Sequence, residues 1–258
     1  MNSKTQDLKR LAPGRILFSL SRLNFRRMEE CATILRWLEP QPGEKVLDIG
    51  CGDGAYDRKI ARSGAEVTGI DIHEKRLSAA RKYYKGDGTK FLFMDASRLD
   101  FPGASFDKAL SLCVVEHLGD DELVMRNLCR VLKPGGLFVF SADSLSHPEI
   151  TPAERSRHQK RYAVNTFYTV DIVRGKLDRA GFDLVEARYI LSTARDLRFI
   201  RLSWKLDDLS GALGPLKLAG YAALGAARKL ASLAPGYAAR PSMGGLTVLV
   251  KARKRIPV

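Results

Sequence analysis

Val46-Leu47-Asp48-Ile49-Gly50-Cys51-Gly52-Asp53-Gly54 is the stretch of this 258-residue chain that decides its fold. It begins as an apolar run typical of a buried strand and ends with glycines at alternate positions. Glycine is needed where a backbone turns tightly or comes close to a ligand. The stretch therefore predicts a strand that enters a ligand-binding turn, with a helix from about Ala55 to Arg62 after it.

The surrounding sequence alternates short β-type runs with helical patterns. The expected strands are residues 45–50, 66–71, 90–95, 106–113, 137–141, 182–190 and 246–251. Helices are expected over residues 26–38, 55–62, 73–84, about 124–132 and 170–180. This alternation is typical of α/β proteins, in which helices cover a parallel sheet.

Acidic residues stand near the ends of the first three predicted strands. Asp48 is badly placed beside a pyrophosphate but suits a ligand with sulfonium and ammonium groups. Asp71 can accept hydrogen bonds from both hydroxyls of a ribose. Ile72 is expected against an adenine ring, and Asp95 with Ala96 at the amino edge of that ring. Because open parallel sheets bind ligands at the carboxyl ends of their strands, these residues predict one crevice.

Charge and composition narrow the class of protein. The net charge of +14 divides into +4 for residues 1–40, −2 for residues 41–150 and +12 for residues 151–258. A basic C-terminal third fits nucleic acid, an anionic membrane face or an acidic small molecule, or serves solubility alone. No apolar run of membrane-spanning length occurs, and the first ten residues are polar, so we expect a cytosolic protein. The four cysteines form no C-x-x-C pair, which predicts neither a zinc site nor a disulfide framework.

Residues 40–142 resemble the class I S-adenosylmethionine-dependent methyltransferases, and within them the type 11 group. The resemblance is carried by VLDIGCGDG at the glycine-rich turn, VTGIDI at the second strand, MDASRLDFPGASFD at the third and VLKPGGLFVF at the fifth. It implies a Rossmann-like, doubly wound sheet of seven strands in the order 3-2-1-4-5-7-6, with strand seven antiparallel. It also implies S-adenosylmethionine as cofactor. The residues expected to bind it are Asp48, Gly50, Cys51, Gly52, Gly54, Asp71, Ile72, Asp95, Ala96 and Cys113.

The function implied is methyl transfer to a small-molecule, lipid or quinone-like acceptor by in-line displacement. An RNA methyltransferase and a non-catalytic S-adenosylmethionine-binding module are the alternatives. The spacing Gly50-x-Gly52-x-x-Ala55 also satisfies the loose dinucleotide fingerprint, so NAD binding competes, as does a turn without ligand. The acceptor atom and the oligomeric state cannot be read from the sequence.

Glu116 and His117 follow the fourth predicted strand and are the expected catalytic residues. His117 has a suitable intrinsic pKa for a general base, while packing of the loop against the sheet is the equal alternative. In metal-dependent quinone enzymes of the family, a glutamate three residues earlier joins this pair as a ligand. Cys113 stands at that position, and a soft thiol disfavours magnesium, so we expect no metal.

The sequence predicts a single domain over residues 1–258. Its expected parts are a helical segment (1–40), a cofactor-binding core (41–142), a substrate-side segment (143–190), a helical insertion (191–245) and a last strand with a basic tail (246–258). The insertion contains Arg195, Arg198, Arg201 and Lys205 on one side of a helix, and Leu197, Ile200 and Trp204 on another. Either a lid over the acceptor or a peripheral contact with an anionic membrane fits this pattern.

Overall fold

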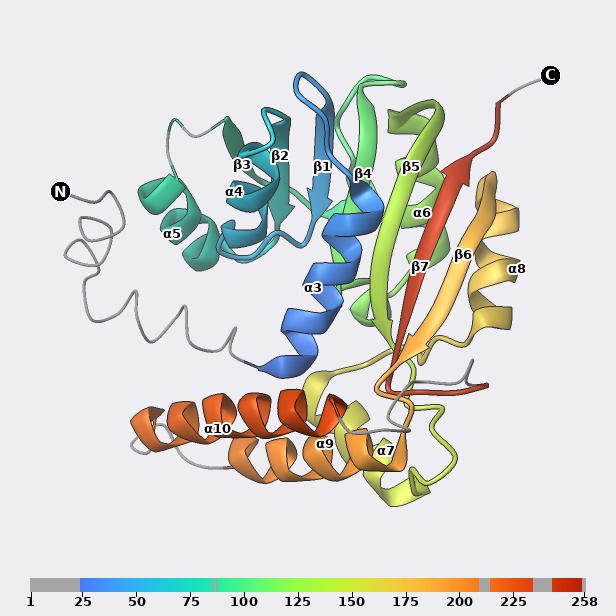
Figure 1. Cartoon of the computed structure of the whole chain (residues 1–258). Coiled ribbons are helices and arrows are strands. Elements are labelled where there is room, and N and C mark those ends of the chain that lie inside the picture. Colours follow the sequence, from blue (N-terminus) through green and yellow to red (C-terminus); the bar gives the residue numbers. More distant parts are fainter. Residues whose placement is uncertain (1–23, 85, 87, 209–213, 234–242, 257–258) are drawn as a thin grey trace, which may run out of the picture. The chain divides into compact units, whose positions relative to one another are not determined.

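The computed structural model describes residues 24–84, 86, 88–208, 214–233 and 243–256 (Figure 1). The chain divides into two compact units. One consists of Glu30–Ile190 and Pro241–Val258, and the other of Met1–Glu29 and Leu191–Arg240. The division after Ile190 coincides with the predicted start of the insertion. The organisation as one domain stays a prediction.

The first unit is built on a seven-stranded sheet in the order β3-β2-β1-β4-β5-β7-β6. The strands are β1 (Lys45–Ile49), β2 (Glu66–Asp71), β3 (Thr89–Phe93), β4 (Phe106–Leu112), β5 (Leu132–Asp143), β6 (Phe182–Ile190) and β7 (Thr247–Lys254). β1 to β5 pair in parallel, whereas β7 is antiparallel to both β5 and β6. The predicted α/β class, strand order and antiparallel seventh strand are thereby confirmed.

Helices pack on this sheet as the alternating sequence predicts. They are α3 (Phe25–Leu38), α4 (Ala55–Ala61), α5 (Glu74–Tyr84), α6 (Asp121–Val131) and α8 (Val170–Ala180). α4 contacts β2, α5 contacts β3 and α8 contacts β6. Figure 1 shows α3 in front of the sheet, with α6 and α8 behind it. A further helix, α7 (Pro152–Tyr162), was not predicted and begins at Thr151, whose hydroxyl accepts from the Glu154 N–H at 3.2 Å.

The core of this unit lies between the sheet and helices α6 and α8. Val124, Leu128 and Val131, the predicted apolar face of α6, are at most 3% exposed. The rings of Phe138 and Phe140 stack with centroids 4.8 Å apart inside the same cluster. Burial of each such side chain contributes about 1.5–3 kcal/mol, which holds β5 in the interior of the unit.

Several predicted strand boundaries were wrong, including the ends of β5 and β7, which lie at Asp143 and Lys254 instead of Ser141 and Lys251. β3 ends at Phe93 instead of Asp95, because the Asp95 carboxylate accepts a hydrogen bond from the Ser97 N–H at 2.8 Å and starts the 3-10 turn η2 (Ala96–Arg98). β5 begins at Leu132, ahead of the predicted start at Leu137. Residues 133–136 form a bulge within β5, where Gly135 has a φ of +74° and the pairing with β4 shifts register.

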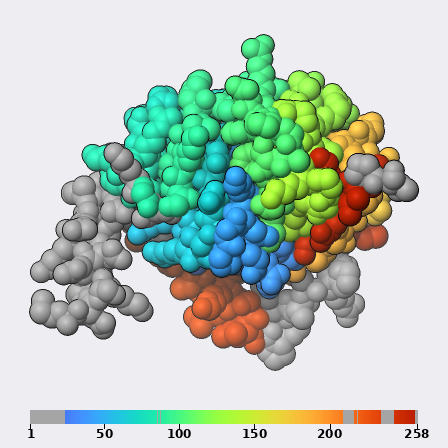
Figure 2. Space-filling view, turned by 90° about the horizontal axis from the view of Figure 1, so that it is seen from above, coloured from blue at the N-terminus to red at the C-terminus, as the bar shows by residue number. Residues whose placement is uncertain are grey.

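Two ion pairs lie at the end of the sheet where the parallel strands begin. Lys133 pairs with Asp107, and Lys108 pairs with Glu44. Figure 2 looks onto this end, where the yellow-green start of β5 lies beside the red end of β7. The carboxyl ends of the parallel strands, where such sheets bind ligands, therefore lie at the opposite end.

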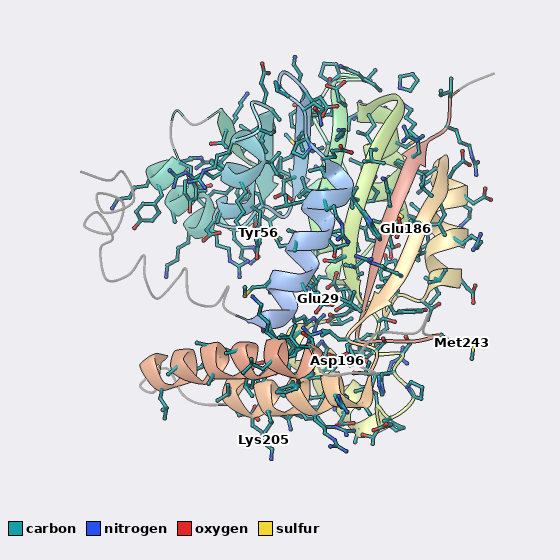
Figure 3. All side chains as sticks on the ribbon, in the orientation of Figure 1. Glu29, Tyr56, Glu186, Asp196, Lys205 and Met243 are labelled. Atoms are coloured by element: carbon teal, nitrogen blue, oxygen red, sulfur yellow. The ribbon has the colours of Figure 1, made fainter. Side chains whose placement is uncertain are left out.

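The second unit contains α9 (Ala194–Asp207) and α10 (Gly214–Ser232), which pack against each other. The Arg228 guanidinium joins them to the start of α3, with nitrogens 2.9 Å from Asp196 Oδ1 and 2.7 Å from Glu29 Oε2. Glu29 and Asp196 are labelled in Figure 3. Because Asp196 is only 3% exposed, Arg228 balances a charge that would be costly to bury alone.

The two predicted faces of α9 are also separated in the structure. Arg195, Arg198 and Lys205 are exposed, whereas Leu197 and Ile200 are at most 2% exposed. Lys205 extends from the side of α9 that faces away from α10 (Figure 3). Arg201 and Trp204 are half-buried. Among the described residues, no helix is both long and apolar enough to cross a membrane.

Candidate cofactor and acceptor site

The glycine-rich turn after β1 has the backbone that its sequence predicts. Gly50, Gly52 and Gly54 have φ angles of +77°, +59° and +74°. A Cβ added at Gly50 would lie 2.4 Å from a methyl group of Val114, so the turn packs closely on the segment after β4. A Cβ at Gly52 would have no atom within 4 Å. Of these three glycines, Gly52 alone combines a left-handed backbone with open space, and this is where a ligand could come close.

Asp71 holds the turn at the end of β2. Its Oδ2 accepts from the Gly52 N–H at 2.9 Å, and its Oδ1 accepts from the His73 N–H at 2.8 Å. Asp71 is 7% exposed, so its carboxylate is largely enclosed by these donors. Ile72 beside it is 58% exposed, an unusual position for a large apolar side chain that nothing covers.

The end of β3 lies next to Asp71, since Phe93 is the register partner of that residue. Phe93 is 61% exposed and was not predicted as a site residue. Asp95 is exposed, and hydrogen bonds from the backbone and side chain of Ser97 lower its pKa. Ala96 is buried at the start of η2. The structure thus brings two exposed apolar side chains, Ile72 and Phe93, to one edge together with an ionised carboxylate.

Asp48 lies in β1 behind the glycine-rich turn and is 2% exposed. Its side chain hydrogen-bonds to the carboxyl group of Asp57, from the first turn of α4. Apart from that contact, Oδ1 of Asp48 and both oxygens of Asp57 have no partner in the described chain. Desolvation, followed by the negative charges of Asp57 and Asp71, raises the pKa of Asp48 well above its usual value. Sequence reasoning missed Asp57.

Glu116 and His117 lie in the 3-10 turn η3 (Val115–His117), which follows β4. Glu116 is fully buried, and its Oε1 accepts from the Asp143 N–H at 3.3 Å. The His117 side chain is 35% exposed, and its Nδ1 lies 3.2 Å from the Ala163 carbonyl oxygen. A carbonyl only accepts, so Nδ1 carries a proton, and in the neutral form of the ring the lone pair is on Nε2. Nε2 lies 3.9 Å from Glu116 Oε1.

A buried polar cluster joins α3 to the ends of β4, β5 and β7. The Cys113 thiol donates to Glu30 Oε2 at 3.2 Å and lies 3.4 Å from Ser141 Oγ. Thr247 donates to the other oxygen of Glu30 at 3.0 Å. Cys113 has a φ of +50°, a strained backbone that the surrounding contacts must hold in place. Sequence reasoning predicted Cys113 here but missed its acceptor, Glu30.

Possible metal ligands occur in the same cluster. One ligand atom each from Cys113, Glu116 and Asp143 lies within 4.8 Å of the others. Asp143 already forms a hydrogen bond with His158, whose Nε2 lies 2.6 Å from Asp143 Oδ2. The thiol of Cys113 is committed to Glu30, and a thiol with two carboxylates mixes soft and hard donors. These residues fit a magnesium ion poorly, and the expectation of no metal stays a prediction.

The comparisons with known proteins agree with this geometry. The family model described as "Methyltransferase domain", of the type 11 group, matches residues 47–140. A ubiquinone biosynthesis O-methyltransferase from Rhizobium etli is 37% identical over 125 residues, which are 46% of this chain and 50% of that relative. The chain thus matches about half the length of this curated relative.

Solved structures share the fold at low sequence identity. A phosphoethanolamine N-methyltransferase 2 from Haemonchus contortus, in complex with S-adenosyl-L-methionine, has a TM-score of 0.65 at 20% identity. The match covers 88% of this chain and 52% of that one. The [4+2]-cyclase SpnF has a TM-score of 0.64 at 19% identity, covering 88% of this chain and 81% of that one. A fold shared with a cyclase shows architecture and leaves the reaction to the site.

Sheet topology, glycine-rich turn and family match together define a class I S-adenosylmethionine-dependent methyltransferase fold. Residues 47–140 match a type 11 methyltransferase domain.

Proposed function

We propose that this chain transfers the methyl group of S-adenosylmethionine to a hydroxyl of a small-molecule, lipid or quinone-like acceptor. The observation that carries the proposal is the edge shared by the open left-handed turn at Gly52, the carboxylate of Asp71 and the accessible ring of His117. Bound there, the cofactor supplies an electrophilic methyl group. The residues of the chain bind it, orient the acceptor and take up a proton.

The cofactor residues divide by the part of the ligand that each would hold. Gly50, Cys51, Gly52 and Gly54 would carry the methionine end, where Gly52 leaves room for it. Asp71 retains acceptor capacity for ribose hydroxyls, since each carboxylate oxygen has two lone pairs. The adenine would lie between the exposed side chains of Ile72 and Phe93. Asp95 and Ala96 remain the residues that we predict to contact the amino edge of the adenine. Cys113 also remains a predicted cofactor contact, although its thiol donates a hydrogen bond to Glu30.

His117 would act as the general base for a hydroxyl acceptor. Its Nδ1–H is held by the Ala163 carbonyl, which leaves the lone pair of Nε2 for the acceptor proton. The nearby carboxylate of Glu116 would then stabilise the imidazolium that forms. Glu116 is itself fully buried, so we assign it this positioning role and no direct contact with the acceptor. Ala163, whose φ is +52°, fixes the carbonyl that sets the tautomer.

The proposal is tested by a transfer assay with labelled S-adenosylmethionine. Hydroquinones and phenols, lipid extracts and tRNA should be offered in parallel, with a His117→Ala variant as a matched control. Label in phenols or lipids that depends on His117 supports the proposal. Label in tRNA alone would establish the RNA alternative. Cofactor binding without transfer to any acceptor class would favour a binding module.

We further propose that the exposed basic side of α9 meets anionic membrane surfaces. Arg195, Arg198 and Lys205 supply charge, and Leu202 on the same helix is 46% exposed. Basic residues near such a surface contribute about 1 kcal/mol each and fade with salt. Burial of Leu197 and Ile200 removes the apolar face that a deep insertion would need, so the contact would be peripheral and electrostatic.

A further inference from the structure

Two buried carboxyl groups lie together behind the glycine-rich turn. Asp48 projects from β1 and Asp57 from α4, with exposed fractions of 2% and 0%. They share the space above Gly69, which is the register partner of Asp48 in β2. A Cβ on Gly69 would lie 2.8 Å from Asp57 Oδ1 and 2.7 Å from the Cβ of Cys51. The pair thus exists only because β2 has a glycine at this position.

No positive charge balances this pair within the described chain. Neither carboxyl group takes part in an ion pair, and the charged neighbours that act on them are all acidic, although a backbone hydrogen bond at Asp57 offsets part of its burial. Asp71 faces them from the end of β2, with His73 bound to its far oxygen. Cys51 faces them from the turn, and burial together with Asp57, Asp48 and Asp71 raises the pKa of its thiol, which keeps it neutral.

Two carboxylates in contact without a cation cannot both be ionised, so the pair shares a proton. Burial raises the pKa of Asp57 to about 7, and that of Asp48 is raised as well. The pair therefore keeps a proton at pH values at which a solvent-exposed carboxyl group has lost it. Such an arrangement is costly for folding, and its position beside the turn suggests a use in binding.

We propose that Asp48 and Asp57 act together as the counter-ion for the cationic end of the cofactor, and that cofactor binding expels their shared proton. The inference rests on the proposed function and adds Asp57 to the binding residues. In the free protein the pair carries one negative charge and one proton. When S-adenosylmethionine binds with its net charge of about +1, set by sulfonium, ammonium and carboxylate groups, the proton leaves to solvent. No covalent bond changes.

The same pair would distinguish cofactor from product. S-adenosylhomocysteine has lost the sulfonium charge, so the pair can take its proton back after the methyl group has been transferred. Because S-adenosylhomocysteine offers no sulfonium charge to the ionised pair, uptake of the proton weakens its binding and favours its release. Asp57 is thus a specificity-determining residue for the charged form of the ligand.

Isothermal titration calorimetry measures the proton directly. S-adenosylmethionine and S-adenosylhomocysteine should be titrated into the whole chain in phosphate and in Tris, whose ionisation enthalpies differ, from pH 6 to 8. For the wild type we expect proton release with S-adenosylmethionine, and an association constant that rises with pH by up to about tenfold per pH unit. S-adenosylhomocysteine should show a smaller release.

The matched variant is Asp57→Asn, whose amide can donate to Asp48 and keep that carboxylate ionised. We expect the variant to bind S-adenosylmethionine without the proton release and with a flat pH profile. His73 contacts Asp71 at this edge and is present in both proteins, so the difference between wild type and variant isolates the carboxyl pair. Should Asp57→Asn fail to fold, as judged by its melting curve, the wild-type titration in two buffers still decides.

Binding of S-adenosylmethionine to the wild type without proton release overturns the inference and leaves the proposed function standing. Equal proton release from wild type and Asp57→Asn also overturns it. Absence of S-adenosylmethionine binding at any pH overturns the proposed function, and this inference with it.

Discussion

Replacing Gly52 by alanine should weaken cofactor binding far more than it weakens the fold. Gly52 has a φ of +59°, and an added Cβ would meet no atom within 4 Å. The stability cost is therefore backbone strain alone, about 1–2 kcal/mol for an L-residue in the left-handed region. For a chain of this size, 1 kcal/mol lowers the melting temperature by about 2–4 °C. The methyl group would, however, enter the space through which the ligand must approach.

Gly43→Ala is the matched control for this prediction. Gly43 has a φ of +79° and equally open surroundings, but it lies in the turn before β1, away from the site. Both variants should melt at similar temperatures, a few degrees below the wild type. We expect the dissociation constant for S-adenosylmethionine, measured by calorimetry, to rise at least about tenfold for Gly52→Ala, equivalent to about 1.4 kcal/mol, and to stay unchanged for Gly43→Ala.

Wild-type affinity in Gly52→Ala would refute the reasoning, because the turn would then not approach the ligand. Gly54→Ala extends the series. Its Cβ would lie 2.4 Å from the Phe91 ring, so it should lose more stability than either of the other variants.

Four further predictions follow from the site and the surface. S-adenosylmethionine should raise the melting temperature by mass action and NAD should not, and Asp71→Ala should lose most of that shift; an equal shift in the variant would contradict the assignment of the ribose site. For a hydroxyl acceptor, His117→Ala should lower kcat about a hundredfold or more at neutral pH with unchanged cofactor affinity, whereas a loss below about threefold would leave positioning alone as the mechanism. Removal of metals with EDTA should leave turnover unchanged, since the Cys113 thiol is held by Glu30; recovery of activity by added Mg²⁺ would show a metal requirement. The wild type should sediment with anionic but not neutral vesicles at low salt, and substitution of Arg195, Arg198 and Lys205 by glutamine should abolish this; equal binding by the variant would place the charge contact elsewhere.

The sequence predicts the strands well because their side-chain patterns are local. β2 and β6 begin and end at the predicted residues. The end of β3 was misjudged, because the side chain of Asp95 competes with the strand for backbone donors. α7 was missed because its sequence is almost wholly polar, with His158 as its buried residue, so it has no apolar stripe to detect.

The glycine-rich turn and the acids at strand ends could be found from spacing, whereas buried acids on helices could not. Glu30 interrupts the apolar face that Ile34 and Leu38 form on α3, and all three are fully buried. Asp57 precedes the buried Ile60 of α4 by one turn in the same way. An acidic residue on an otherwise apolar helix face was the available signal. Its partners, Cys113 and Thr247 for Glu30, come from distant parts of the chain.

The insertion leaves the sheet and returns to it at one point. Ile190 and Thr247 are register partners, and the Leu246 N–H donates to the Ile190 carbonyl at 3.2 Å. The hydrogen bonds between β6 and β7 therefore hold both ends of residues 191–245 together. The register of these two strands does not depend on the length of that segment. The cost of closing such a loop grows only with the logarithm of its length. We therefore expect residues 191–245 to tolerate insertions and deletions without a change in the register of β6 and β7.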